Sequence, residues 1–368
     1  MSDTSPEKIL IIINSMNVGG AETFAMKLFR KIDKSKIIMD FLVNTAEDGF
    51  YSEEIRRMGG QVYHTYPKSK HPFKNFMTIK RIVRANKYSI VVRFAEHPIV
   101  ATDLIAAKLG GAKKTIVRST NTSTGKKFSN VIAFFFRPLL NLNADVKIAP
   151  STESAIWLFG KRAVKKNKIT LLKNGLDFDY YRFSETRRNL VRRQLNISSS
   201  ALVFGHIGRF NAQKNHFFLI DLFLQILKQW PNSILALVGD GDLKSEVERY
   251  AFEKGLSGCV LFLGVRTDIP DLLSSFDCFL LPSLYEGLPN VIIEAQAVNL
   301  PCVLSDAITK EVAVTNLVSF CSFKDDKDVW CKEIEKKLQL SNDRKQPVYM
   351  PGYSIDEITN QFVEMVTK

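Results

Sequence analysis

Short apolar, β-branched runs alternate with helical patterns along the whole sequence, and this alternation is the feature that most restricts the fold. In the helical pattern over residues 21–32, for example, Phe24, Leu28 and Ile32 repeat every four residues. Such alternation is typical of a parallel α/β sheet. The expected strands span residues 8–13, 37–43, 89–94, 114–118, 146–149, 201–207, 233–238, 259–263, 277–281 and 301–304.

The 368 residues are enough for two domains, each with its own core. A charged helical pattern over 185–195 precedes a new strand near Ala201, which favours a boundary shortly before it. We therefore expect two doubly wound, Rossmann-like domains over residues 1–180 and 181–350. An amphipathic helix over 351–368 follows a Pro351-Gly352 break, and we expect it to pack back on the first domain.

The net charge of +13 is concentrated in one half of the chain. Residues 1–180 hold 30 Lys and Arg against 15 Asp and Glu, whereas residues 181–368 hold 21 against 23. A one-sided basic surface suggests a polyanionic partner such as anionic lipid, a lipid-linked diphosphate or nucleic acid, and a generic solvated face is the alternative. The basic residues lack interleaved aromatics on one stretch, so nucleic acid is not expected. Residues 71–84 and 161–168 are the best candidates for contact with an anionic membrane.

The sequence predicts a cytoplasmic protein that is peripheral on the inner face of the membrane. No apolar run approaches the roughly 20 residues that cross a bilayer, and the polar start does not indicate a signal peptide. The five cysteines are at least ten residues apart, which excludes a CxxC pair and fits a reducing compartment.

The strongest candidate site is the acidic segment Leu281-Pro-Ser-Leu-Tyr-Glu-Gly-Leu-Pro-Asn-Val-Ile-Ile-Glu-Ala-Gln-Ala297. A buried strand ends in a loop with Glu286 and Gly287, and Pro289 stands where a helix would begin. This places a carboxylate and free N–H groups at the carboxyl edge of a parallel sheet, where ligands of such folds bind. Glu294 lies in an otherwise apolar helix, where an unpaired carboxylate would be costly.

A second, basic segment is His206-Ile-Gly-Arg-Phe-Asn-Ala-Gln-Lys-Asn-His216. It joins a strand to a helix and carries Arg209 and Lys214, which could donate hydrogen bonds to phosphate oxygens. The Leu237-Val-Gly-Asp-Gly-Asp242 turn carries Gly239 and Gly241, which would let a nucleotide approach the backbone; an ordinary turn is the alternative. In the first half, Gly19 and Gly20 give a tight turn and an open helix N-terminus.

These segments together resemble family 4 glycosyltransferases (glycosyl transferases group 1), in the branch that builds capsular polysaccharides and exopolysaccharides. Two glutamates eight positions apart, in the form E-G-L-P-x-x-x-x-E-A, match that family's EX7E motif, and Arg209 and Lys214 match its G-R-x-x-x-x-K-N pattern. The resemblance covers nearly the whole chain. It implies a GT-B fold of two Rossmann-like domains facing a central cleft, with the acceptor on the first domain and the nucleotide-sugar donor on the second.

The resemblance also implies roles for single residues. Glu286 would face the donor sugar hydroxyls, Gly287 and Leu288 would present backbone amides to the diphosphate, and Glu294 would bind the ribose. Arg209 and Lys214 would offset the charge on the leaving phosphate. The loop with Gly19 and Gly20 is used in the family at the donor phosphates or at the acceptor. Further positions implied at the donor are Gly239, Gly241, Val265 and Arg266.

One departure from the family concerns histidines. Related enzymes often carry histidines after the strand that corresponds to 89–94 and again near 119–121, whereas this chain has His97 a few residues later. His97 could take over the role beside the sugar or be an incidental loop residue. Arg93 and Arg118 are alternative groups for an anionic acceptor.

The resemblance implies a retaining, metal-independent glycosyltransferase with no cofactor beyond its nucleotide-sugar donor, for which UDP is the expected nucleotide. The expected acceptor is a lipid-diphosphate-linked or growing saccharide in surface polysaccharide synthesis. Two alternatives stay open: a sugar-nucleotide 2-epimerase on the same fold, and a non-catalytic GT-B-like partner subunit.

Overall fold

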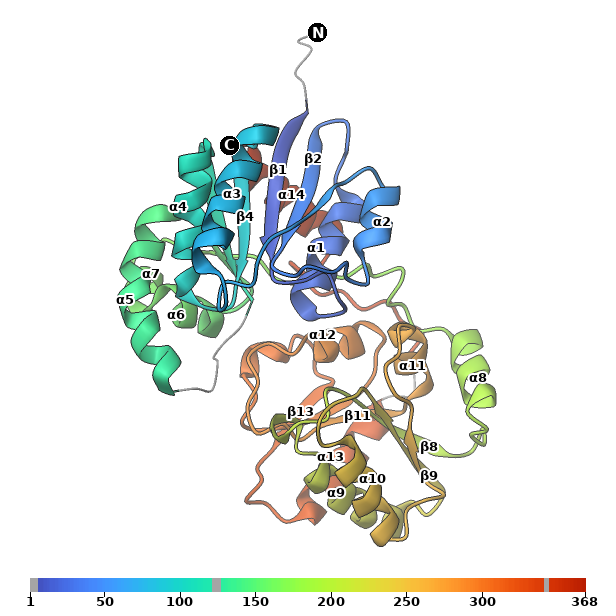
Figure 1. Ribbon diagram of the computed structural model, residues 1–368. Helices are drawn as coiled ribbons and strands as arrows, with labels where there is room; N and C mark the ends of the chain where they lie inside the picture. The colour runs from blue at the N-terminus through green and yellow to red at the C-terminus, as the bar shows by residue number, and fades with distance from the viewer. Residues whose placement is uncertain (1–5, 121–126, 341–343) are drawn as a thin grey trace. The chain divides into compact units, whose positions relative to one another are not determined.

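The computed structural model describes residues 6–120, 127–340 and 344–368, and these form two compact units (Figure 1). Unit 1 comprises Met1–Gly175 and Gly352–Lys368, and unit 2 comprises Leu176–Pro351. The chain thus passes from one unit to the other after Gly175 and after Pro351, near the boundaries expected at 180 and 350.

Unit 1 is built on a seven-stranded sheet in the order β3-β2-β1-β4-β5-β6-β7, and every neighbouring pair is parallel. Alternate residues of β1 face opposite sides, so that Ile9, Ile11 and Ile13 join one core cluster and Leu10 and Ile12 join another. The strands are β1 (Glu7–Ile13), β2 (Ile37–Val43), β3 (Val62–His64), β4 (Ile90–Ala95), β5 (Lys114–Ser119), β6 (Val146–Ala149) and β7 (Thr170–Leu171).

Helices cover both faces of this sheet. Residues of α1 and α14 lie in the cluster with Ile9, and residues of α3 and α4 lie in the cluster with Leu10. The C-terminal helix therefore belongs to the core of unit 1, to which it contributes Ile358, Phe362 and Val366. The helices are α1 (Gly20–Lys31), α2 (Ser52–Arg57), α3 (Pro72–Asn86), η1 (Pro98–Val100), α4 (Ala101–Gly110), α5 (Lys127–Asn143), α6 (Thr152–Phe159), α7 (Lys161–Lys165) and α14 (Ile355–Thr367).

Unit 2 contains a six-stranded parallel sheet in the order β10-β9-β8-β11-β12-β13. Its strands are β8 (Leu202–Ile207), β9 (Ser233–Val238), β10 (Val260–Phe262), β11 (Cys278–Leu281), β12 (Cys302–Ser305) and β13 (Val318–Cys321). Its helices are α8 (Glu185–Gln194), η2 (Ala212–Lys214), α9 (His216–Gln229), α10 (Lys244–Glu253), α11 (Ile269–Ser275), α12 (Asn290–Ala297), η3 (Lys310–Val312) and α13 (Lys327–Leu340).

All ten expected strands are present, and the structure adds β3, β7 and β13, which are edge strands. In each sheet the strand order reverses once, between β1 and β4 in unit 1 and between β8 and β11 in unit 2. Such a switch point opens a crevice at the carboxyl ends of the two strands, where ligands of doubly wound sheets bind. None of the helices in the described ranges is both long and apolar enough to cross a membrane.

Candidate active site

The switch point of unit 2 brings the basic and the acidic segments together. β8 leads into the loop with Arg209 and Lys214, and the neighbouring β11 leads into the loop with Glu286. Because both strands run in the same direction, both loops emerge at the same edge of the sheet. Segments far apart in the sequence therefore become neighbours.

Lys214 and Glu286 form an ion pair at this edge. Lys214 Nζ lies 2.7 Å from Glu286 Oε1, and the two side chains are only 14% and 13% exposed. Ser283 Oγ donates a further hydrogen bond of 3.3 Å to the same carboxylate oxygen. A largely buried, charge-assisted pair of this kind holds both groups in place far more firmly than a surface pair would.

Hydrogen bonds fix the two loops to each other around this ion pair. Leu284 N donates to Gln213 O at 2.8 Å, and Gln213 Nε2 donates to Tyr285 O at 2.9 Å. Glu286 also forms a parallel bridge with Ile308, after β12. The Lys214 backbone is set by Asn211, whose side chain accepts from Lys214 N at 3.2 Å. The sequence patterns had not indicated Gln213 or Ser283 as site residues.

Arg209 does not join this ion pair. Its side chain is 69% exposed, and its nearest carboxylate is that of Asp242 at 4.0 Å. A pair of such length and exposure contributes little energy, so the guanidinium stays available for another anion. The structure thus places one predicted cation in a buried pair and leaves the other at the surface.

Gly239 and Gly241 occupy backbone conformations that favour glycine, with φ of +137° and +154°. A Cβ on Gly239 would lie 2.1 Å from Gly208 O, and one on Gly241 would lie 2.5 Å from Phe210 O. The turn after β9 therefore packs directly on the backbone of the segment that carries Arg209. Close packing between these two loops accounts for both glycines without a ligand, and contact with a nucleotide remains a proposal.

Val265 and Arg266 follow β10 and differ in their surroundings. Val265 is exposed, whereas Arg266 forms two hydrogen bonds with the carboxylate of Asp268, Nε to Oδ1 at 2.8 Å and Nη2 to Oδ2 at 2.5 Å. Hydrogen bonding to Arg266 lowers the pKa of Asp268. The guanidinium charge is therefore already balanced within its own loop.

The remaining acidic-segment residues lie at the start of α12. Gly287 is buried and Leu288 is half-buried in the loop before Pro289, the N-cap of the helix. The first turns of a helix leave backbone N–H groups without intrahelical acceptors, which suits an anion. Glu294, on the same helix, is half-buried.

Two histidines that sequence reasoning left without a role lie beside Lys214. His206 and His216 are fully buried, with ring centroids 4.8 Å apart, and Phe210 stacks on His216 at 4.1 Å. His206 Nδ1 lies 2.8 Å from Leu280 O, so this nitrogen carries the proton and donates it. Burial, with the nearby charge of Lys214, lowers the pKa of His216 to about 4 and that of His206 well below its usual value. Both rings are therefore neutral at pH 7.

The predicted residues of unit 1 gather at its own switch point. Gly19 is the N-cap of α1 after β1, and Gly20 is the first residue of that helix. His97 follows β4, the neighbour of β1. His97 Nδ1 accepts from Ile99 N at 3.3 Å, and its ring meets Trp157 edge-on at 6.1 Å. These contacts fix His97 as the N-cap of η1.

Arg93 and Arg118, the alternative groups for an anionic acceptor, lie in the interior of unit 1. Both are buried: Arg93 Nε bonds Asp103 Oδ2 at 2.9 Å, and the Arg118 guanidinium lies 3.8 Å from the centre of the Phe24 ring. A group missed from sequence is Glu22 of α1, which accepts from Ser15 Oγ at 3.4 Å. Burial raises the pKa of Glu22.

Comparison with known proteins connects this geometry to a family. The model of glycosyl transferases group 1 matches residues 201–339, and that of glycosyltransferase family 4 matches residues 18–180. The chain is 33% identical to EpsF of Bacillus subtilis over 351 residues, which covers 94% of this chain and 91% of EpsF. The chain belongs to glycosyltransferase family 4.

A second relative and a solved structure extend the comparison. The Escherichia coli UDP-Gal:α-D-GlcNAc-diphosphoundecaprenol α-1,3-galactosyltransferase is 25% identical over 309 residues, 80% of each chain. The crystal structure of Anabaena HepE in complex with UDP and glucose superposes with a TM-score of 0.79 at 20% identity, over 98% of this chain and 100% of that one. The fold of this family 4 chain is accordingly GT-B, with two Rossmann-like domains.

Proposed function

We propose that this chain is a retaining glycosyltransferase that moves a sugar from a UDP-sugar to a saccharide carried on a lipid diphosphate, in surface polysaccharide synthesis. The observation that carries the proposal is the pair of Lys214 and Glu286, held at the switch point of unit 2. The named donor and acceptor of the Escherichia coli relative, UDP-Gal and a diphosphoundecaprenol-linked sugar, support the choice of substrates.

In the proposed reaction, unit 2 holds the donor and unit 1 the acceptor. Glu286 accepts hydrogen bonds from the sugar hydroxyls, and Glu294 accepts from the ribose. The amides of Gly287 and Leu288 face the diphosphate at the start of α12. Arg209, which is exposed and weakly paired, and Lys214 donate to phosphate oxygens.

The chemical step breaks the bond between the anomeric carbon and the phosphate oxygen, and forms a bond from that carbon to an acceptor hydroxyl oxygen on the same face. The hydroxyl proton goes to the departing phosphate. Lys214 and Arg209 stabilise the negative charge that develops there. Lys214 is largely buried, which strengthens its interaction with this charge. Transfer without a metal ion or further cofactor is part of the proposal.

A hydrolysis and thermal-shift panel across UDP-, GDP- and ADP-sugars tests the donor, and NMR of the product anomer tests retention. We expect UDP-sugars to stabilise the protein and to be turned over with retention. Release of a free epimerised sugar without acceptor would favour a 2-epimerase instead. Failure of every nucleotide sugar to bind or react would favour a non-catalytic subunit.

The basic excess of residues 1–180 fits a peripheral position on the anionic inner face of the cell membrane, where a lipid-linked acceptor would lie. We include this position in the proposal.

A further inference from the structure

Two helices of unit 1, α3 and α5, present unusual surfaces on the same side of the sheet. Each packs against α4, and Figure 1 shows the three helices in succession along one side of unit 1. Neither α3, PFKNFMTIKRIVRAN, nor α5, KFSNVIAFFFRPLLNLN, contains an acidic residue. This side of unit 1 therefore presents two helices without a negative side chain.

Large apolar side chains stand exposed on both helices. Phe73 of α3 is 75% exposed, and Phe134 and Phe135 of α5 are 71% and 70% exposed. Met77 and Val131 are also exposed, one helical turn from these phenylalanines. Clustered aromatic side chains in water mark a surface that is covered in the working protein.

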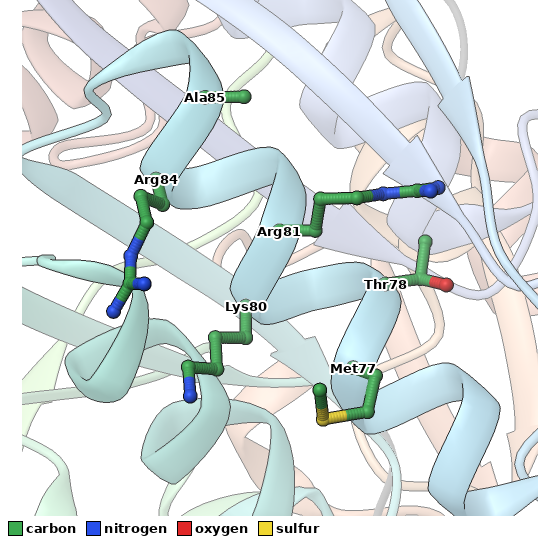
Figure 2. Close-up of a pocket in the computed structure, with 6 residues that line it drawn as sticks. All are labelled: Met77, Thr78, Lys80, Arg81, Arg84 and Ala85. Carbon is green, nitrogen blue, oxygen red and sulfur yellow. The ribbon is translucent and has the colours of Figure 1, made fainter.

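Cations continue the exposed stripe of α3 beyond Met77. Lys80, Arg81 and Arg84 line a surface hollow of about 480 Å³ together with Met77, Thr78 and Ala85 (Figure 2). Arg81 extends to one side of the helix and Lys80 and Arg84 to the other. Within the described residues no carboxylate pairs with these three cations; Arg84 Nη2 donates to Leu109 O of α4 at 3.3 Å. The hollow is therefore suited to an anionic group.

The connectivity of the sheet places the first turns of both helices toward the loops with Gly19, Gly20 and His97. A helix that follows a parallel strand starts at the carboxyl edge of the sheet, so the first turns of α3 and α5 lie toward that edge. Gly19, Gly20 and His97 stand at the same edge. Phe73, the second residue of α3, thus lies toward this edge, whereas Phe134 and Phe135 lie half-way along α5.

We infer that the surface formed by Phe73, Met77, Lys80, Arg81 and Arg84 of α3 and Val131, Phe134 and Phe135 of α5 docks on an anionic phospholipid bilayer. The aromatic rings enter the boundary between headgroups and acyl chains, while the three cations of α3 contact lipid phosphates. Charge complementarity favours an anionic bilayer as the partner, because the two helices carry cations and no acidic side chain that would repel an anionic headgroup. Only the purpose of this docking, access to a lipid-linked acceptor, rests on the proposed function.

Co-sedimentation of the full chain with vesicles tests this surface. Vesicles of phosphatidylcholine alone are compared with vesicles that also contain phosphatidylglycerol, at low and at moderate salt. We expect binding only to the anionic vesicles. K80Q/R81Q should lose about ten-fold or more in affinity, because each basic residue near the surface contributes about five-fold. F134S/F135S should also bind more weakly, because it removes the apolar area that enters the bilayer. Salt should weaken the binding of the wild-type chain.

Matched variants in unit 2 separate this surface from a general effect of charge or hydrophobicity. Phe252 of α10 is 72% exposed, and Arg249 and Lys228 are exposed cations. F252S and K228Q/R249Q should bind the anionic vesicles like the wild-type chain. Equal losses in these controls, or equal binding of the wild-type chain to both kinds of vesicle, would overturn the inference. So would self-association of the wild-type chain that F134S/F135S abolishes, because the surface would then join two copies.

Hydrolysis of UDP-sugars in vesicle-free buffer keeps this inference distinct from the proposed function. F134S/F135S and K80Q/R81Q should retain that hydrolysis, which also shows that they are folded. Hydrolysis without any vesicle binding would contradict the docking surface alone. Vesicle binding without turnover of any nucleotide sugar would contradict the proposed function alone.

Discussion

Lys214 Nζ lies 2.7 Å from Glu286 Oε1, so the main cation and the main carboxylate of the candidate site neutralise each other. The contact exists because β8 and β11 are neighbours at the switch point of the unit 2 sheet. In the proposed function, a nucleotide sugar would offer a phosphate to the ammonium and hydroxyl donors to the carboxylate. The pair would then be the arrangement of the site before the donor binds.

Replacing either member of this pair should remove most of the turnover. We expect Lys214→Met and Glu286→Gln each to lower kcat by about 10²–10³, the effect of losing one preorganised electrostatic group. The double variant should be little worse than the more damaged single variant, because groups that act as a unit are not additive. Steady-state kinetics with a UDP-sugar measures this.

The control for this pair is Lys244→Met. Lys244 forms a long ion pair with Glu248 on α10, 3.9 Å apart, outside the candidate site. Its turnover should equal that of the wild-type chain. Wild-type turnover in both Lys214→Met and Glu286→Gln would show that the site is assigned wrongly.

The turn after β9 should not tolerate side chains. Gly239→Ala and Gly241→Ala would each place a Cβ within 2.5 Å of a backbone oxygen in the segment that leads to Lys214. Each strained position should cost about 1–3 kcal/mol of stability. The shift of that segment should also weaken donor binding. Thermal unfolding and UDP titration measure the two effects.

Gly258→Ala is the matched substitution for that turn, since a Cβ there meets nothing within 4 Å. It should leave both stability and UDP affinity close to wild type. If Gly239→Ala behaved in the same way, the packing of the two loops would not matter for the site.

Sequence patterns predicted the inner strands of both sheets and one edge strand, β10. They missed the other edge strands, which are β3, β7 and β13. The long strands are continuous buried runs such as β1 and β4, which periodicity detects. β7 is only two exposed residues, Thr170 and Leu171, and β3 is half-buried throughout, so neither gives an apolar run. Their pairing is imposed by the neighbouring strand rather than by their own residues.

In the candidate site, too, the sequence identified single residues but not the contacts between them. Glu286 and Lys214 could be singled out as candidate site residues because each stands in a recognisable loop after a strand. Their direct contact depends on strand order, which the linear pattern does not contain. Burial of Arg93 and the pairing of Arg266 with Asp268 were equally hidden, because charge in a sequence says nothing about which charges a fold pairs internally.

The histidines beside Lys214 should make unit 2 sensitive to acid. The pKa of His216 falls from about 6.5 in the unfolded chain to about 4 in the folded one, so the unfolded chain binds more protons between these values. Stability should therefore be complete above about pH 7 and decline as the pH falls toward 4, by roughly 3 kcal/mol for this residue. Thermal unfolding across pH 4–8 measures the slope.

His216→Phe isolates that contribution. Phenylalanine retains the stacking on Phe210 but takes up no proton, so the stability of this variant should fall less steeply with acid. A wild-type slope in His216→Phe would mean that other groups govern the acid response.

The buried carboxylate of Asp103 should be the most sensitive charged position in unit 1. It is 1% exposed, accepts from Arg93 Nε at 2.9 Å and pairs with Lys68. Asp103→Asn would leave two cations facing a neutral amide, which should cost about 3–5 kcal/mol. Glu253→Gln breaks an exposed pair with Arg249, 3.8 Å apart, and should cost less than about 1 kcal/mol. Chemical denaturation measures both free energies of unfolding.

A functional consequence should accompany this loss, because Arg93 Nη2 also donates to Asn14 Oδ1 at 3.0 Å, in the loop that leads to Gly19. Without Asp103 to hold Arg93, that loop should loosen. We expect Asp103→Asn to raise the KM for the acceptor while donor hydrolysis, which the proposed function assigns to unit 2, stays close to wild type. Equal damage to both activities would show that Asp103 supports the whole chain rather than the acceptor side.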